Sequence, residues 1–336
     1  MKTLTCVQPG SFSYSDETMP SAEPGYSILK IKRIGVCGTD LHAFDGTQPF
    51  FTYPRILGHE LAAEFVEGDA EGVAPGDIVT VIPYIHCGSC FACSTGKTNC
   101  CSSLKVCGVH VDGGMREYFK VPSSIVIKNT DLDLDQLALV EPLSIGAHAV
   151  ERASILPSEH VLVMGGGPIG MGVVQFALLK KAHVILLDMN QERLDFCSSH
   201  FQGVTVINGA QVDVKNRLAE LTQGNMPSVV FDATGNLNAI NNGFSLMSHA
   251  ARYILVGLQL KEISVSHPEF HKREGTLMSS RNATKADFAY VMDCISKGLI
   301  EPHKMITHRL TFEQVAQDFK GLADPAQKVI KALIEL

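Results

Sequence analysis

The sequence predicts an α/β protein with a β-rich N-terminal part followed by a doubly wound parallel sheet. Residues 1 to about 145 are punctuated by Gly and Pro and hold short alternating runs, such as 28–34 and 78–82. Beyond residue 160, short apolar runs typical of buried strands alternate with helical stretches. A glycine-rich turn joins the first of these runs to the first helix.

Length and composition limit the class of protein. The 336 residues are 45% hydrophobic and 19% charged, which excludes a disordered chain and suggests about two domains. The formal net charge of −7 attracts neither nucleic acid nor anionic lipid, so we expect no partner of either kind. The longest uncharged apolar run, 161–179, is broken by the glycine turn, which argues against a transmembrane span. The start has no apolar core of signal-peptide length, so we expect a cytoplasmic protein.

A mixed set of metal-binding side chains lies in the β-rich part. Cys37 opens the segment Cys-Gly-Thr-Asp-Leu-His, His59 and Glu60 follow a glycine, and Glu141 comes much later. One thiolate, one imidazole and one or two carboxylates, with a water or substrate oxygen in the remaining position, have the composition of a catalytic zinc site. The spacing leaves open which carboxylate binds the metal directly.

Five of the ten cysteines lie between residues 87 and 101, which is not the distribution of a secreted disulfide framework. Four thiolates satisfy tetrahedral zinc without an open position, and the usual spacings of iron–sulfur clusters differ. We therefore predict a structural zinc bound by Cys87, Cys90, Cys93 and Cys101, with Cys100 as the alternative fourth ligand. The other cysteines outside the catalytic-type set are expected to be small buried side chains: Cys6, Cys107, Cys197 and Cys294.

The turn after the apolar run 161–164 reads Gly-Gly-Gly-Pro-Ile-Gly and fits the pattern G-x-G-x-x-G of dinucleotide-binding turns. Gly165 permits the tight turn, Gly167 lets a pyrophosphate approach the backbone, and Gly170 lets helix and strand pack closely. Pro168 and Ile169 lie where the helix N-terminus presents free N–H groups to the phosphates.

Asp188 ends the next predicted strand, 182–187. Its carboxylate can accept both ribose hydroxyls of an adenosine and would repel a 2′-phosphate, so NAD is preferred over NADP. Arg193 is a mild counter-signal and a further candidate for the cofactor site, although a solvated helix face is the simpler interpretation.

The rest of this part continues the parallel sheet. Strands are predicted at 204–207, 229–232 and 253–256, with helices near 212–222 and 237–247. Thr234 and Gly257 follow two of these strands, at the edge where such sheets bind ligands.

Taken together and in this order, these motifs resemble the zinc-dependent medium-chain alcohol dehydrogenases over essentially the whole chain. Glu141-Pro142-Leu143-Ser144 is typical of the polyol and sugar-acid branch, which includes sorbitol-type and threonine-type dehydrogenases. The resemblance implies a GroES-like catalytic domain over 1–145, a Rossmann NAD-binding domain over 146–274, and a segment 275–336 that rejoins the first domain. It also implies Cys37, His59 and Glu141 around a catalytic zinc, with Glu60 as direct ligand or alternate.

The resemblance further implies a reaction. Zinc acts as a Lewis acid on a substrate hydroxyl, and a hydride passes from carbon to the nicotinamide. Thr39 would pass the proton through the cofactor ribose to His42, although Thr39 could instead cap a helix and His42 could be a surface histidine. The expected cofactors are two zinc ions per chain and NAD, and the expected assembly is a homo-oligomer, either a dimer or a tetramer.

We therefore expect reversible oxidation of a secondary hydroxyl of a polyol or sugar acid, a small-molecule alcohol. The alternatives are oxidation of L-threonine at C3 and a non-catalytic nucleotide-binding protein on the same fold. Arg281 could contact a cofactor or substrate carboxylate, or simply precede a helix capped by Asn282; His110 and Asp112 could face the cleft or form a structural turn. Helical periodicity is expected at 284–297 and 311–322.

Overall fold

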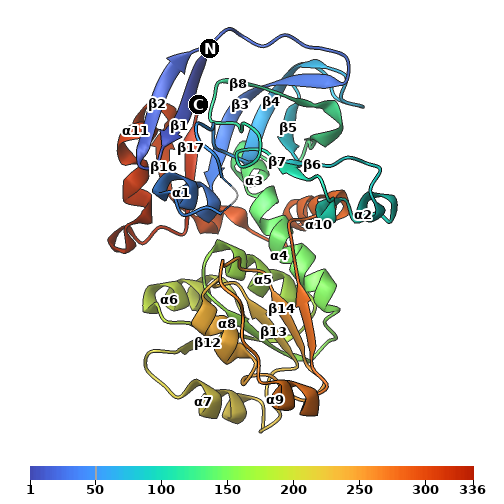
Figure 1. The fold of residues 1–336 in the computed structure, drawn as a ribbon, viewed down its shortest axis with the longest axis vertical. Coiled ribbons are helices and arrows are strands. Elements are labelled where there is room, and N and C mark those ends of the chain that lie inside the picture. The colour runs from blue at the N-terminus through green and yellow to red at the C-terminus, as the bar shows by residue number, and fades with distance from the viewer. Residues whose placement is uncertain (50) are drawn as a thin grey trace. The chain divides into compact units, whose positions relative to one another are not determined.

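The structure is a computed structural model that describes residues 1–49 and 51–336 (Figure 1). The chain forms two units, one of Met1–Pro142 with Ala283–Leu336 and one of Leu143–Asn282. The first unit is β-rich and the second is built on a parallel sheet. This confirms the predicted fold class.

A seven-stranded sheet forms the centre of the first unit, in the order β16-β17-β3-β4-β5-β9, with β8 also paired to β3. Its strands and those of two small sheets are β1 (Lys2–Gln8), β2 (Ser11–Asp16), β3 (Tyr26–Val36), β4 (Glu60–Gly68), β5 (Ile78–Val81), β6 (Tyr84–Ile85), β7 (Lys105–Val106), β8 (Tyr118–Pro122), β9 (Val126–Lys128), β16 (Ile306–Thr311) and β17 (Lys331–Glu335). The α-helices of this unit are α1 (Gly38–Asp45), α2 (Phe91–Ser94), α3 (Leu134–Ala138), α10 (Lys285–Ser296) and α11 (Val315–Asp318). Helix α4 (Val140–Ala153) spans the division between the units.

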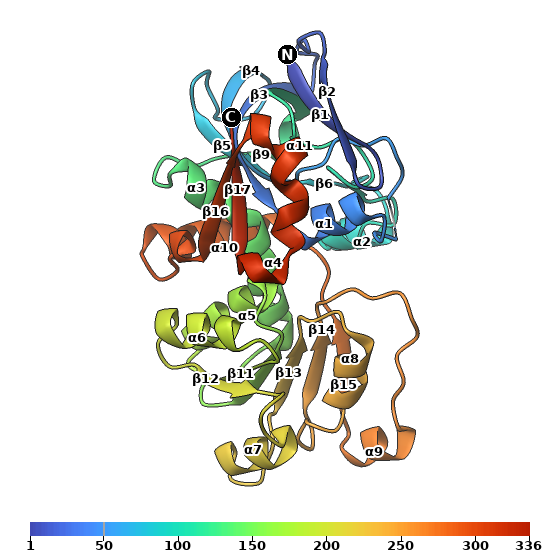
Figure 2. The same ribbon diagram turned by 90° about the vertical axis from the view of Figure 1, so that its left-hand side faces the viewer.

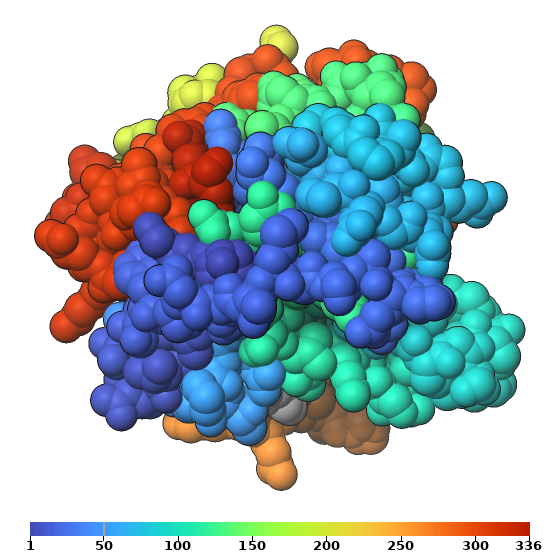
Figure 3. Space-filling model, turned by 90° about the horizontal axis from the view of Figure 1, so that it is seen from above, coloured from blue at the N-terminus to red at the C-terminus, as the bar shows by residue number. Residues whose placement is uncertain are grey.

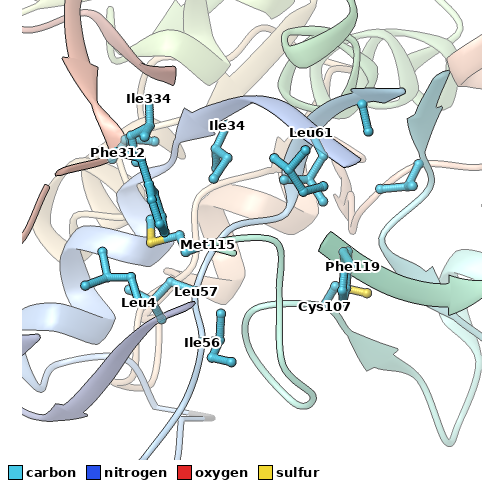
Figure 4. Close-up of a cluster of buried hydrophobic side chains, with 14 of the residues drawn as sticks. Leu4, Ile34, Ile56, Leu57, Leu61, Cys107, Met115, Phe119, Phe312 and Ile334 are labelled. Atoms are coloured by element: carbon cyan, nitrogen blue, oxygen red, sulfur yellow. The ribbon is translucent and has the colours of Figure 1, made fainter. Parts of the chain in front are cut away.

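The core of the first unit draws on segments far apart in the sequence. Figure 4 shows Leu4, Leu57, Met115 and Phe312 among its buried side chains, from strand β1, the loop before β4, the loop before β8 and the C-terminal segment. Burying aliphatic and aromatic side chains of this size is the main stabilising contribution to such a unit. The N-terminal and C-terminal parts of the chain are therefore held in one core.

The C-terminal segment returns to the first unit as part of its sheet. Strand β17 pairs antiparallel with β3, with Ile334 opposite Ile34, and β16 runs parallel to β17 (Figure 2). The space-filling view shows the red C-terminal residues beside the blue N-terminal ones (Figure 3). The pairing brings residue 331 next to the segment that leads into Cys37.

Residues 311–322, where helical periodicity was expected, do not form one continuous helix. They form the short α11 between two 3₁₀ turns, Phe312–Gln314 and Phe319–Ala323. The buried residues Phe312, Val315, Phe319 and Leu322 follow one another every three or four positions, which suits a mixture of 3₁₀ and α winding. The expected helical periodicity is therefore present, divided between a short α-helix and two 3₁₀ turns.

The second unit contains a six-stranded parallel sheet in the order β12-β11-β10-β13-β14-β15. Its strands are β10 (His160–Met164), β11 (His183–Asp188), β12 (Thr205–Asn208), β13 (Val229–Asp232), β14 (Arg252–Leu255) and β15 (Thr276–Ser279). Its helices, besides the end of α4, are α5 (Pro168–Leu179), α6 (Gln191–His200), α7 (Val214–Leu221), α8 (Leu237–Gly243) and α9 (His267–Lys272).

The strand order reverses between β10 and β13, which defines the switch point where doubly wound sheets bind ligands at the carboxyl ends of their strands. The glycine turn follows β10 at this point, and the turn carrying Thr234 follows β13. Within the described residues, no helix is both long and apolar enough to cross a bilayer.

Candidate active site

The catalytic-type ligand set begins at the end of β3. Cys37 caps the N-terminus of α1 with an extended backbone (φ −94°, ψ 156°). Asp40, in the first turn of α1, is buried and accepts hydrogen bonds from the N–H groups of Cys37 at 2.9 Å and Gly58 at 3.2 Å. Its Oδ1 also lies 3.6 Å from Nδ1 of His59. Asp40 thus ties together the two segments that carry Cys37 and His59.

Three ligand atoms converge here: Sγ of Cys37, a ring nitrogen of His59 and a carboxylate oxygen of Glu60 lie within 4.8 Å of one another. Nδ1 of the buried His59 has no hydrogen-bond partner among the residues that the structure describes. Burial lowers the pKa of His59, but Asp40 and Cys37 outweigh burial and raise this pKa well above its ordinary value. A thiolate, an imidazole and a carboxylate are a set of three protein ligands suited to a catalytic zinc. Cys37, His59 and Glu60 therefore fit a catalytic zinc ion.

Glu60 is held by a buried lysine that the sequence analysis missed. Nζ of Lys331, on β17, donates to the two carboxylate oxygens of Glu60 at 2.7 and 2.8 Å and to the carbonyl of Val36 at 3.1 Å. Lys331 is 2% exposed and Glu60 is fully buried. Gly35 makes room for this pair, because a Cβ there would lie 2.0 Å from a Glu60 oxygen. Burial lowers the pKa of Lys331, but Glu60 more than compensates and the pKa is raised.

Glu141, near the start of α4, lies beside this set but outside the group of mutually close ligand atoms. It accepts a hydrogen bond from the hydroxyl of Tyr84, a second residue that the sequence analysis missed. Burial is the main cause that raises the pKa of Glu141 to about 7; His59 lowers it and Glu60 raises it. Burial, followed by Glu141 itself, raises the pKa of Tyr84 well above its ordinary value.

Thr39 and His42 both lie on α1. The structure corrects one alternative for Thr39: the cap of α1 is Cys37, and Thr39 lies inside the helix. His42 is exposed, and its Nδ1 lies 3.0 Å from Oγ1 of Thr47. Thr39 is therefore two residues from Cys37, and His42 is one helical turn further on.

The cysteine lobe brings together Sγ atoms of Cys87, Cys90, Cys93 and Cys101, all within 4.8 Å of one another. Cys100 is exposed and lies outside this group. Backbone N–H groups point at the sulfurs, with Cys90 N–H donating to Cys87 at 3.3 Å. Backbone hydrogen bonds lower the pKa of Cys90 to about 5, which favours the thiolate that zinc requires. The other four cysteines predicted to be buried are buried: Cys6, Cys107, Cys197 and Cys294.

The glycine turn has the backbone that close phosphate approach needs. Gly165 has φ +100°, and a Cβ on Gly170 would lie 1.8 Å from the carbonyl oxygen of Gly165. Gly167 caps α5, which begins at Pro168, followed by Ile169. The N-terminus of α5 therefore lies directly at the glycine turn, as predicted for Pro168 and Ile169.

Asp188, at the end of β11, faces the same turn. Its carboxylate accepts the N–H groups of Gly166 at 2.5 Å and of Asn190 at 2.8 Å. Nη1 of Arg193 lies 4.0 Å from the position of a Cβ on Gly167. Asp188 and Arg193 thus lie at the edge where the ribose of a dinucleotide is expected.

A buried carboxylate orders the neighbouring turns. Asp232 accepts hydrogen bonds from Oγ1 of Thr234 at 2.5 Å and from the N–H of Gly235 at 3.1 Å. A Cβ on Gly257 would lie 2.3 Å from the nitrogen of Gly235, so the ends of β13 and β14 meet without room for a side chain. Asp232 was not predicted as a site residue, because its partners lie on the turn and not in a known motif.

The other candidate residues named in the sequence analysis are His110, Asp112, Arg281 and Asn282. Nδ1 of His110 accepts the N–H of Val106 at 3.1 Å, and Asp112 accepts the N–H of Ile56 at 3.2 Å. Asn282 is not a helix cap: α10 is capped by Thr284, whose side chain accepts the N–H of Asp287. Arg281 lies just before that cap, in the second unit.

Comparison with known proteins places the chain in a family. Residues 23–131 match the family described as "Alcohol dehydrogenase GroES-like domain", and residues 168–297 match "Zinc-binding dehydrogenase". L-galactonate-5-dehydrogenase from Escherichia coli K12 is 40% identical over 99% of this chain and 98% of that protein. Sorbitol dehydrogenase from Halalkalibacterium halodurans is 30% identical over 94% of each chain.

A solved structure agrees with this placement. The alcohol dehydrogenase RspB from E. coli CFT073, complexed with NADH, has a TM-score of 0.93 and 32% identity, and the match covers 100% of this chain and 99% of that one. The chain therefore belongs to the zinc-dependent alcohol dehydrogenases, in their polyol and sugar-acid branch, and is an NAD-dependent oxidoreductase.

Proposed function

We propose that this enzyme oxidises a secondary hydroxyl of a sugar acid with NAD, at a zinc held by Cys37, His59 and Glu60. The observation that carries the proposal is the convergence of these three ligand atoms within 4.8 Å, in a chain that also has the dinucleotide turn. When bound, the zinc would supply Lewis-acid chemistry to the substrate hydroxyl, and NAD would accept the hydride.

The chain's own residues have defined tasks in this proposal. Asp40 holds the backbone before His59 and lies 3.6 Å from Nδ1 of its ring, and Lys331 balances the charge of Glu60 in a place that excludes water. Thr39 and His42, spaced along α1, would take the substrate proton toward solvent, with exposed His42 at the outer end.

Cofactor choice follows from the second unit. Asp188 ends β11 with a carboxylate at the glycine turn, where it would accept ribose hydroxyls and repel a 2′-phosphate. We propose that Gly165, Gly167 and Gly170 with Pro168 and Ile169 bind the pyrophosphate, and that Arg193, Thr234 and Gly257 line the remaining dinucleotide site.

We also propose a second zinc in the cysteine lobe, which makes two per chain. Four sulfurs within 4.8 Å of one another leave no open position, so this metal would stabilise the lobe and take no part in the reaction. We also propose that the protein works in a compartment that keeps thiols reduced, such as the cytoplasm, because the thiolates of both zinc sites must not be oxidised to disulfides.

The proposal includes a homo-oligomer. Strand β15 ends the parallel sheet with β14 as its one neighbour in the described sheet, and Leu277 on β15 is 40% exposed. An exposed edge strand offers unpaired backbone groups to a second copy of the chain. Sedimentation velocity of the purified protein would test this: a monomer at micromolar concentration would contradict it.

The sugar-acid substrate is supported by the name of the 40% identical relative, L-galactonate-5-dehydrogenase. The test is a panel of aldonates, polyols and L-threonine incubated with purified protein and NAD, followed by NADH absorbance. We expect turnover of an aldonate, its loss in Cys37→Ala, and its retention in Cys100→Ala, which changes an exposed cysteine outside both ligand sets. Turnover of L-threonine without turnover of aldonates or polyols would contradict the proposal.

A further inference from the structure

Two histidines lie side by side at the amino ends of neighbouring strands in the parallel sheet of the second unit. His160 is the first residue of β10, His183 is the first residue of β11, and the two are partners in the strand register. Neighbouring strands lie about 4.7–4.9 Å apart, and partner residues project from the same face of the sheet. The centroids of the two imidazole rings are 5.1 Å apart. The register therefore brings two side chains that can bind metal together at one edge of the sheet.

The ring nitrogens of this pair are not used by the rest of the unit. Within residues 1–49 and 51–336, no group forms a hydrogen bond or an ion pair with either imidazole. Their backbone groups, by contrast, are paired: the N–H of His183 donates to the carbonyl of Glu159 at 2.9 Å. Burial, followed by the charge of His183, lowers the pKa of His160. This imidazole is therefore neutral at neutral pH and has a lone pair for a metal ion.

The two rings border an open space. They line a cavity of about 150 Å³ together with Gly203, Thr205 and Leu221. One water molecule needs about 10–15 Å³ of such space, so the cavity has room for an ion and for the waters that complete its coordination. No acidic side chain lines this cavity in the part of the chain that the structure describes.

The surroundings select the kind of ion. The carboxylate nearest in sequence, that of Glu159, accepts hydrogen bonds from Arg252 and from Oγ of Ser228 and is therefore already occupied. Magnesium and calcium take oxygen ligands, which this pair does not offer, whereas imidazole suits zinc, copper and nickel. The pair thus favours a transition-metal ion over magnesium or calcium.

The spacing of the rings also suits one shared ion. A bond from zinc to an imidazole nitrogen is about 2.0–2.1 Å long, which places the centroids of two rings on the same zinc roughly 4.6–5.3 Å apart for angles between square and tetrahedral. The observed 5.1 Å falls in this range. His183 is exposed and neither ring is held by a hydrogen bond, so both rings can turn about their side-chain bonds to bring a nitrogen to the ion.

We propose that His160 and His183 form a further metal site, which binds a transition-metal ion such as Zn²⁺ and joins the amino ends of β10 and β11. Water would fill the remaining positions of the ion. Two protein ligands hold an ion more weakly than three or four, so this one would leave on dialysis into zinc-free buffer. At about 3.3 Å per residue, the five residues of β10 separate the site from the glycine turn by roughly 13 Å. The ion would therefore stabilise the second unit without competing with NAD, and the inference does not depend on the proposed function.

The test is the zinc that the protein takes up beyond its tightly held ions. Protein dialysed into zinc-free buffer is equilibrated with micromolar zinc chloride, and zinc per chain is measured before and after by elemental analysis. His267 and His271 lie one turn apart on α9 with ring centroids 5.8 Å apart, so they are a rival pair, and every variant therefore carries His271→Gln. In this background we expect one further zinc per chain, and we expect that zinc to be lost in both His160→Gln and His183→Gln.

Thermal unfolding gives a second readout, because an ion that binds only the folded state raises Tm. Zinc chloride should raise the Tm of the background protein more than that of His160→Gln or His183→Gln, and magnesium chloride should not reproduce this difference. His200→Gln is the matched control. This histidine is exposed in the same unit, and its Nδ1 bonds the carbonyl of Phe196 at 2.8 Å, so its loss should leave zinc uptake unchanged.

Equal zinc uptake by the background protein and both histidine variants would overturn the inference, as would a background protein that takes up no further zinc. NADH binding checks the fold of each variant and should be unchanged, because the glycine turn lies at the other end of the strands. If His160→Gln loses NADH binding, the variant of the exposed His183 decides alone. Absent turnover with zinc uptake intact would count against the proposed function and not against this site.

Discussion

Replacing Lys331 by methionine tests the buried ion pair that supports the ligand set. Lys331→Met keeps the length and the apolar part of the side chain and removes only the ammonium. Glu60, fully buried, would then lose the donor at 2.7 and 2.8 Å from its two oxygens. Breaking a buried pair by removing one partner typically costs about 3–5 kcal/mol, because the remaining charge is uncompensated. We expect a loss of that size in the free energy of unfolding of the metal-free protein.

Zinc should reduce this loss, because the cation compensates the same carboxylate. The assay is urea unfolding followed by circular dichroism, on chelator-treated and on zinc-loaded protein. The double variant Lys331→Met with Glu60→Gln should recover most of the stability, since it leaves no buried charge behind. Lys297→Met is the matched control: its ion pair with Asp293 is exposed on both sides, so no measurable change is expected. A loss below about 1 kcal/mol in metal-free Lys331→Met would refute the reasoning.

Three other predictions concern separate parts of the chain. Gly170→Ala places a Cβ 1.8 Å from a backbone oxygen and should weaken NADH binding at least tenfold, as measured by fluorescence titration. Gly321→Ala is the control, because a Cβ there meets open space and should leave NADH binding unchanged. Equal NADH binding by the two variants would contradict the role of the glycine turn. Burial raises the pKa of Asp135, but its ion pairs with Arg309 and Arg33 outweigh burial and lower that pKa. The stability that these ion pairs contribute is therefore fully present above the ordinary pKa of a carboxyl group, and it is lost as the pH falls through the lower pKa of the folded state. Unfolding measured against pH should show that loss in the wild type and a shallower one in Asp135→Asn, and identical slopes would exclude the pair as its cause. Thr39→Val should lower kcat about 100-fold and leave zinc content unchanged, and an unaltered kcat would remove Thr39 from the proton path.

The sequence analysis found the features that are local in the chain. The glycine turn, the cysteine lobe and the segments around Cys37 and His59 can be recognised because their chemistry depends on residues a few positions apart. The same holds for five strands of the six-stranded parallel sheet, whose apolar runs are short and uninterrupted, with the strand at 229–232 reproduced to the residue. The edge strand β15 was missed, because its residues are largely exposed and form no apolar run.

Lys331, Tyr84 and Asp232 could not be found in this way. The role of Lys331 depends on the pairing of β17 with β3, which joins residues almost a whole chain apart. The one sequence cue was a lysine at the start of the apolar run Lys-Ala-Leu-Ile. In the sequence, Tyr84 is an ordinary strand residue and Asp232 is an ordinary strand end. Only the structure shows that the Tyr84 hydroxyl donates to Glu141 and that the Asp232 carboxylate accepts from Thr234.

Zinc content per chain tests the central claim most directly. Elemental analysis of the wild-type protein, Cys37→Ala and Cys90→Ala should give about two zinc ions, one and one, with activity abolished and NADH binding retained in Cys37→Ala. One zinc in the wild-type protein that survives in Cys37→Ala, together with undiminished turnover in that variant, would contradict the account.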